Sequence, residues 1–106
     1  MTTFDDRDKG FENKYAHDEE LAFKAMARRN KLLGQWAAAK LGKKDAIAEQ
    51  YAKDVVMADF ENSGDVVSKV LKDFTHAGIK ISEKEVRTEM ERLLPVARKQ
   101  IMGEEK

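Results

Sequence analysis

The sequence lacks cysteine altogether and contains a single proline. Without cysteine, disulfides, thiolate nucleophiles and sulfur-ligated zinc or iron sites are all excluded. One proline and six glycines in 106 residues are too few for a series of hairpin turns, which argues against an all-β fold. No apolar run approaches the ~18 residues that a membrane span requires, and the N-terminus lacks the basic-then-apolar layout of a signal peptide.

The chain also lacks net charge and the usual constellations of catalytic residues. Twenty basic side chains balance twenty acidic ones, so no global attraction to nucleic acid or anionic lipid is expected. The histidines, His17 and His76, have no ligand spacing, and no metal site is expected. There is no glycine-rich phosphate loop and no serine with a plausible histidine partner. We therefore expect a protein that is not an enzyme.

What the chain does contain favours an all-α fold. Ala, Glu, Lys, Leu and Arg make up about half of it, a composition typical of helical proteins. Apolar residues recur at steps of three and four, which predicts helices over about residues 18–40, 44–60, 65–77 and from 82 onward. Four amphipathic helices with short connections predict a four-helix bundle over residues 18–106. The length of the chain fits one such domain.

Local signals mark the ends of these helices. Ser82 and Glu85 form a capping box, in which the serine hydroxyl accepts from the backbone N–H of Glu85 and the glutamate reaches back. Pro95 should kink the fourth helix or split its end, because proline has no N–H to donate. Helix boundaries are also expected at four glycines. These are Gly42, Gly64, Gly78 and Gly103.

The helical stripes predict the core. Trp36 is expected to anchor it, and methionines 26, 57 and 90 are expected to be buried rather than to bind a cofactor. In the connector that follows the third helix, the apolar side chains of Ile79 and Ile81 should pack against the bundle.

The balanced charge is unevenly distributed. Residues 1–20 carry seven acidic and three basic side chains, residues 21–44 carry seven basic and no acidic ones, and residues 45–65 carry six acidic and one basic. The basic block could be a surface for an acidic partner or a polyanion. It could equally be a solvated helix face that pairs with the acidic second helix, and this second interpretation is favoured.

Residues 1–17, which we call the arm, are not needed by the bundle. Without a dense apolar stripe, the arm should be flexible or a fraying helix when free. On a helix, however, Phe4, Phe11 and Tyr15 would share one side, although Gly10 opposes a preformed helix by about 1 kcal/mol. The pattern predicts a segment that folds on a partner. Folding back onto the bundle and a merely solubilising role remain alternatives.

Several long motifs resemble one known family. Residues 6–14 read Asp-Arg-Asp-Lys-Gly-Phe-Glu-Asn-Lys, residues 17–21 read His-Asp-Glu-Glu-Leu, and residues 27–38 read Ala-Arg-Arg-Asn-Lys-Leu-Leu-Gly-Gln-Trp-Ala-Ala. Further anchors are Tyr-Ala-Lys-Asp-Val-Val-Met-Ala-Asp-Phe at residues 51–60 and Gly-Asp at 64–65. The chain closely resembles the zeta subunit, the ATPase inhibitor of alphaproteobacterial F-type ATP synthases. The resemblance covers essentially the whole sequence.

The resemblance implies a four-helix bundle preceded by a mobile inhibitory arm. It implies that the arm enters a catalytic interface between the alpha and beta subunits of the head and reaches towards the gamma subunit. Rotation in the hydrolysis direction would stop, while synthesis would continue. The inhibitory candidates implied by position are Phe4, Asp5, Arg7, Lys9, Gly10, Phe11, Glu12, Lys14 and Tyr15.

The same resemblance implies a cytoplasmic protein, peripheral on the inner face of the inner membrane through ATP synthase. We expect no nucleic-acid partner, no direct membrane insertion and a monomer when free. No cofactor is required, but the family is linked to weak adenine-nucleotide binding by the bundle. The basic face around Arg28, Arg29 and Lys31 is the best electrostatic host for a nucleotide. The alternatives to an inhibitor are a generic helical adaptor and a nucleotide-sensing module.

Overall fold

A computed structural model describes the backbone of residues 2–61 and 66–104, and the side chains of residues 19–59 and 66–104. It contains four helices, α1 (Thr2–Lys40), α2 (Asp45–Glu61), α3 (Val66–His76) and α4 (Glu83–Glu104), and the described part has no strand. The predicted all-α class is therefore confirmed. None of the described helices is long and apolar enough to cross a membrane.

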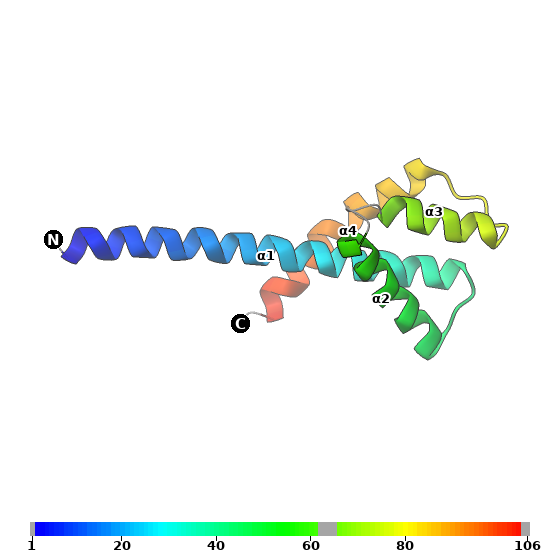
Figure 1. Ribbon diagram of the computed structural model, residues 1–106, viewed down its shortest axis with the longest axis horizontal. Coiled ribbons are helices and arrows are strands. Elements are labelled where there is room, and N and C mark those ends of the chain that lie inside the picture. The colour runs from blue at the N-terminus through cyan, green and yellow to red at the C-terminus, as the bar shows by residue number, and fades with distance from the viewer. Residues whose placement is uncertain (1, 62–65, 105–106) are drawn as a thin grey trace.

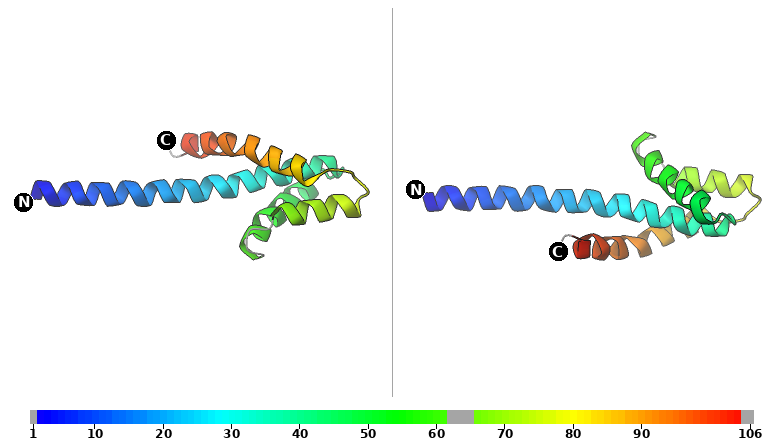
Figure 2. Two further views of the ribbon diagram at one scale, coloured as in Figure 1. Left: turned by 90° about the horizontal axis from the view of Figure 1, so that it is seen from above. Right: turned by 90° about the horizontal axis from the view of Figure 1, so that it is seen from below.

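The molecule is elongated because α1 is much longer than the other helices. It measures 66 × 25 × 23 Å, and the 39 residues of α1 at ~1.5 Å per residue account for roughly 58 Å of that length. The second half of α1 contacts α2 and α4, while the first half projects beyond them (Figures 1 and 2). The prediction that this helix begins near Asp18 is wrong, since the helical backbone continues to Thr2.

The core lies where α1 meets the other three helices. Its fully buried centre holds Leu33 of α1, Val55 of α2, Val70 and Phe74 of α3, and Val86 of α4. Trp36 packs its ring edge-to-face with Phe74 at a centroid distance of 5.8 Å, so its predicted anchoring role is confirmed. Ile79 and Ile81 of the connector also pack against this core, as predicted.

The methionine prediction is wrong for two of its three members. Met26 is 44% exposed and Met57 is 49% exposed, whereas Met90 packs against the core. The reason is that each helix carries more apolar positions than its neighbours can cover, so the edges of the stripes remain at the surface.

A glycine in the middle of α1 sets how closely α1 approaches α2. A Cβ atom at Gly34 would lie 2.7 Å from the backbone Cα of Ala52 and 3.2 Å from the Cβ of Val55. Contacts below about 3 Å are not tolerated, so only glycine permits this approach. The missing side chain lets two backbones pack directly on one another.

The predicted helix ends are confirmed at three places. Gly42 and Gly78 adopt positive φ angles of 77° and 74°, and the amide after each donates to a carbonyl five residues earlier, as in a Schellman cap. The amide of Glu85 donates to Ser82 Oγ at 3.1 Å, and the serine hydroxyl in turn faces the carboxylate of Glu85 at 3.4 Å.

The helix end expected at Gly103 is wrong, since α4 still includes Gly103. Of the two outcomes expected at Pro95, a split does not occur, because packing on α1 holds both sides of the proline. Gly64 lies outside the described residues.

Candidate functional site

The arm forms the first part of α1. The nine inhibitory candidates all fall between positions 4 and 15 of this helix, which projects beyond the other helices in Figures 1 and 2. Because positions 4, 11 and 15 are separated by seven and four residues, a helical backbone places them on one face. The side chains of the nine candidates lie outside the described set.

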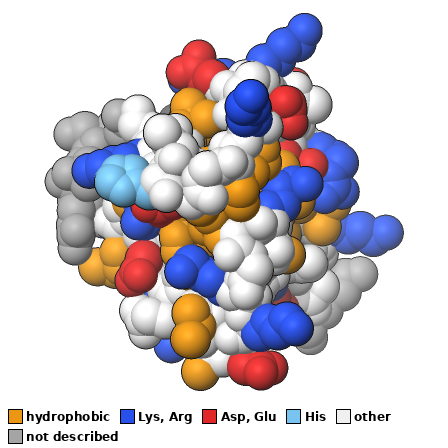
Figure 3. Space-filling view, turned by 90° about the vertical axis from the view of Figure 1, so that its right-hand side faces the viewer, with side chains coloured by type: hydrophobic (Ala, Val, Ile, Leu, Met, Phe, Trp, Pro, Cys, Tyr) orange, Lys and Arg blue, Asp and Glu red, His pale blue; other side chains and the backbone are white. Residues whose placement is uncertain are grey.

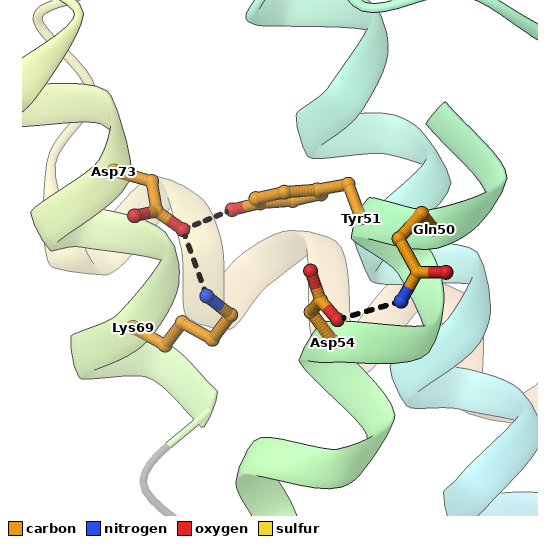
Figure 4. Close-up of polar contacts among 5 residues, drawn as sticks. All are labelled: Gln50, Tyr51, Asp54, Lys69 and Asp73. Carbon is orange, nitrogen blue, oxygen red and sulfur yellow. Dashed lines mark hydrogen bonds and ion pairs between the residues drawn. The ribbon is translucent and has the colours of Figure 1, made fainter. Parts of the chain in front are cut away.

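A polar cluster connects α2 and α3 within the bundle (Figure 4). The hydroxyl of Tyr51 donates to Asp73 Oδ2 at 2.7 Å, and Lys69 Nζ reaches the same oxygen at 3.3 Å. Lys43 and Lys69 also lie over the Tyr51 ring, at 5.6 and 5.4 Å from its centre. Burial, together with the hydrogen bond to Asp73, raises the pKa of Tyr51.

This cluster links α2 to α3. Its phenol stays protonated at neutral pH, since its pKa is raised, and it is therefore a hydrogen-bond donor and not a base. Within the same view, Gln50 donates to Asp54 at 3.0 Å along α2.

The basic block of α1 divides between several partners. Arg28 bonds to Gln100 and Glu104 of α4, each at 2.9 Å, while Lys40 lies 5.3 Å from the Trp36 ring centre. Arg29 donates to Asn30 Oδ1 at 3.0 and 3.2 Å. Burial lowers the pKa of Arg29, and the charge of Asp59 opposes that effect.

The favoured pairing of this block with the acidic second helix is seen at Asp59, whose charge acts on Arg29. Asp59 is the acid of α2 that acts on the block among the described side chains, whereas Asp45, Glu49 and Asp54 face solvent. The contact between α1 and α2 is made by small apolar residues such as Ala52.

A basic hollow of about 400 Å³ opens beside α1, near the end of α4. Its basic members, Lys24, Arg28 and Lys31, are spaced by four and three residues and so share one helix face. Its apolar members are Ala27, Val56 and Ile101, and Glu104 completes the lining. The hydrogen bond from Arg28 lowers the pKa of Glu104.

This geometry brings together two of the three residues suggested for nucleotide binding. Arg28 and Lys31 line the basic hollow, but Arg29 does not; it turns towards Asn30, which is fully buried. The helical period places Arg29 on a different face from Arg28 and Lys31, so the sequence alone could have excluded it from the hollow. No sequence signal could have identified Glu104, since it reaches the hollow only through the packing of α4 on α1.

Comparison with known proteins decides the family. The family model described as ATPase inhibitor subunit zeta matches residues 1–100. The chain belongs to this family. It is therefore related to inhibitors of an ATPase, as the resemblance predicted. Membership of the family supports an inhibitory role on ATP synthase, and it suggests that the protein is regulatory and not catalytic.

A solved relative agrees with the fold. A protein structure determined by NMR in solution is 50% identical to this chain, with a TM-score of 0.67, and the match covers 77% of this chain and 95% of the other. No curated protein matches the chain.

Proposed function

We propose that the chain inhibits ATP hydrolysis by inserting its arm into a catalytic interface of the ATP synthase head. The alpha and beta subunits would form this interface, and the arm would reach the gamma subunit and block the rotor in the hydrolysis direction. The protein would lie on the inner face of the inner membrane, held there by the enzyme. Membership of the zeta family supports the inhibitory role.

The observation that carries the mechanism is the continuity of α1. One helix extends from the tip of the arm into the packed bundle, so the arm is a rod of roughly 24 Å with a broad body at its base. Helices that enter grooves bind through one face, as positions 4, 11 and 15 would allow. A body about 25 × 23 Å across stays outside such a groove and sets the depth of insertion.

The experiment adds the full chain, or a version without residues 1–17, to the cognate ATP synthase and measures hydrolysis and synthesis. The full chain should suppress hydrolysis and spare synthesis, and the shortened chain should do neither. A full-length variant with Phe4, Phe11 and Tyr15 replaced by alanine should behave like the shortened chain. The matched control is Met57→Ala, which removes an exposed apolar side chain from α2. Equal inhibition by all versions would contradict the role of the arm.

The basic hollow supports a second candidate function, which is adenine-nucleotide binding. Three cations on one face of α1 could contact phosphates, while Ala27, Val56 and Ile101 offer an apolar floor to a base. Titration with ATP should then move the amide resonances around the hollow to saturation. Lys31→Ala should weaken this binding, and Lys84→Ala, which removes an exposed lysine from α4, should not. Scattered changes without saturation would argue against the site.

A further inference from the structure

An apolar groove lies at the base of the arm, between α1 and the end of α4. Its volume is about 170 Å³, enough for one aliphatic or aromatic side chain. Its lining consists of Leu21, Ala22 and Ala25 from α1 and Arg98, Ile101 and Met102 from α4. We call this the base groove.

The base groove is open because it lies beyond the main core. The buried core cluster takes its α1 members from Leu33 onward and its α4 members up to Leu93. Past these residues, the lining of the groove comes from α1 and α4 alone. Ala25 and Ile101 form its buried floor, at 2% and 6% exposed, whereas Met102 on its edge remains 59% exposed. Several apolar side chains that line one groove, Leu21 and Met102 among them, are a more informative sign of a contact surface than one exposed residue alone.

The groove is fixed in position relative to the arm. Both belong to α1, and Leu21 follows Tyr15 by six residues, or about 9 Å along a helix. A partner that encloses the arm as far as Tyr15 therefore ends within about two helical turns of the groove. The arm of the same chain cannot fill the groove, because the continuous helix directs it away (Figure 2).

We propose that the base groove docks onto the outer surface of the ATP synthase head, at the rim of the opening that receives the arm. This inference rests on the proposed function and adds a second contact to it. The groove would take one apolar side chain of the head, with Arg98 beside it to pair with a neighbouring acid. Charge supports an acidic rim through Arg98 in the groove and Lys31 in the neighbouring hollow, which shares Ile101 with it. Lys24 and Arg28 of that hollow already pair with Glu20 and Glu104.

The test is the double variant Ala22→Glu with Met102→Glu in the full chain, added to the cognate ATP synthase. Both positions are exposed, so the bundle should remain folded, and its thermal unfolding is measured alongside. The glutamates place charge in the groove and oppose an acidic rim. We expect the complex to dissociate about tenfold faster, because losses of buried interface contacts act mainly on dissociation.

The matched control is Ile47→Glu, which makes the same kind of change at the far end of the molecule. Ile47 is 65% exposed in the first turn of α2. Figure 3 shows this end, where hydrophobic side chains lie among Lys and Arg side chains. Dissociation of this control should match that of the unchanged chain. Equal acceleration by both variants would overturn the groove as a specific contact.

Two further outcomes keep the two proposals apart. If the double variant dissociates at the unchanged rate while removal of residues 1–17 abolishes inhibition, the base groove is not a docking site and the arm mechanism stands. If the unchanged chain dimerises in light scattering and the double variant does not, the groove binds a second copy, and the proposed contact with the head is overturned.

Discussion

The two halves of α1 have the same backbone conformation but different support. The second half buries Leu33, Ala37 and Ala38 completely against other helices, whereas the first half projects beyond them. Helices in water derive most of their stability from tertiary packing rather than from propensity. The second half of α1 is therefore held by the fold, whereas the first half requires a partner to be held equally well.

The largest expected effect separates the packed bundle, represented by Phe74 of α3, from the first half of α1, represented by Phe11. Phe74, fully buried against Trp36, should cost about 3–5 kcal/mol of the free energy of unfolding when changed to alanine. Phe11→Ala should change that free energy by less than about 0.5 kcal/mol, although it should weaken inhibition. Urea denaturation measures both. Comparable losses of stability would mean that the arm belongs to the folded core.

The two glycines within α1 should respond differently to the same substitution. Gly34→Ala should destabilise the bundle by about 1–3 kcal/mol, since the new Cβ would overlap the backbone of Ala52. Gly10→Ala should instead leave the unfolding transition unchanged and favour the helical arm by about 1 kcal/mol. Thermal unfolding and the far-ultraviolet helical signal distinguish these results. A stable Gly34→Ala variant would contradict the close contact between α1 and α2.

A smaller effect is expected at Tyr51. Tyr51→Phe keeps the ring but removes the bond to Asp73, which should cost about 1 kcal/mol. Because the folded-state pKa of Tyr51 is raised, its contribution is complete below the ordinary tyrosine value of about 10 and is lost as the pH rises through the folded value. The unchanged chain should therefore lose stability above pH ~10 more steeply than Tyr51→Phe. Parallel pH profiles would contradict this.

The smallest effect concerns Glu104, which bonds to Arg28 close to where the two halves of α1 meet. Its pKa is lowered by that hydrogen bond, so its contribution to stability is present above the ordinary glutamate pKa and disappears as the pH falls through the folded value. A carboxyl titration by NMR should give a midpoint below the ordinary value. High salt or Arg28→Gln should raise it. A midpoint unmoved by both would contradict the pairing.

Local chemistry explains which parts of the fold could be predicted. The caps at Gly42, Gly78 and Ser82 depend on a few adjacent residues, and their positions followed from the sequence alone. The beginning of α1 did not, because the arm lacks the apolar stripe from which helices are recognised. The exposure of Met26 could not be predicted either, since it depends on how far the neighbouring helices reach.

The candidate sites show the same division. The spacing of Lys24, Arg28 and Lys31 is a property of one helix, whereas Glu104, Val56 and Ile101 reach the basic hollow through tertiary packing. The base groove likewise requires the end of α4 to lie beside Leu21, which no periodic pattern specifies. Residue roles in the arm were implied by family resemblance and not by spacing.

Amide hydrogen exchange of the chain, free and bound to the ATP synthase head, measures how each half of α1 is held. We expect amides 2–17 to exchange rapidly in the free chain and to become strongly protected in the complex, while amides 30–38 are protected in both. Unchanged exchange of amides 2–17 on binding would contradict the claim that the first half of α1 is the part that acts on the partner.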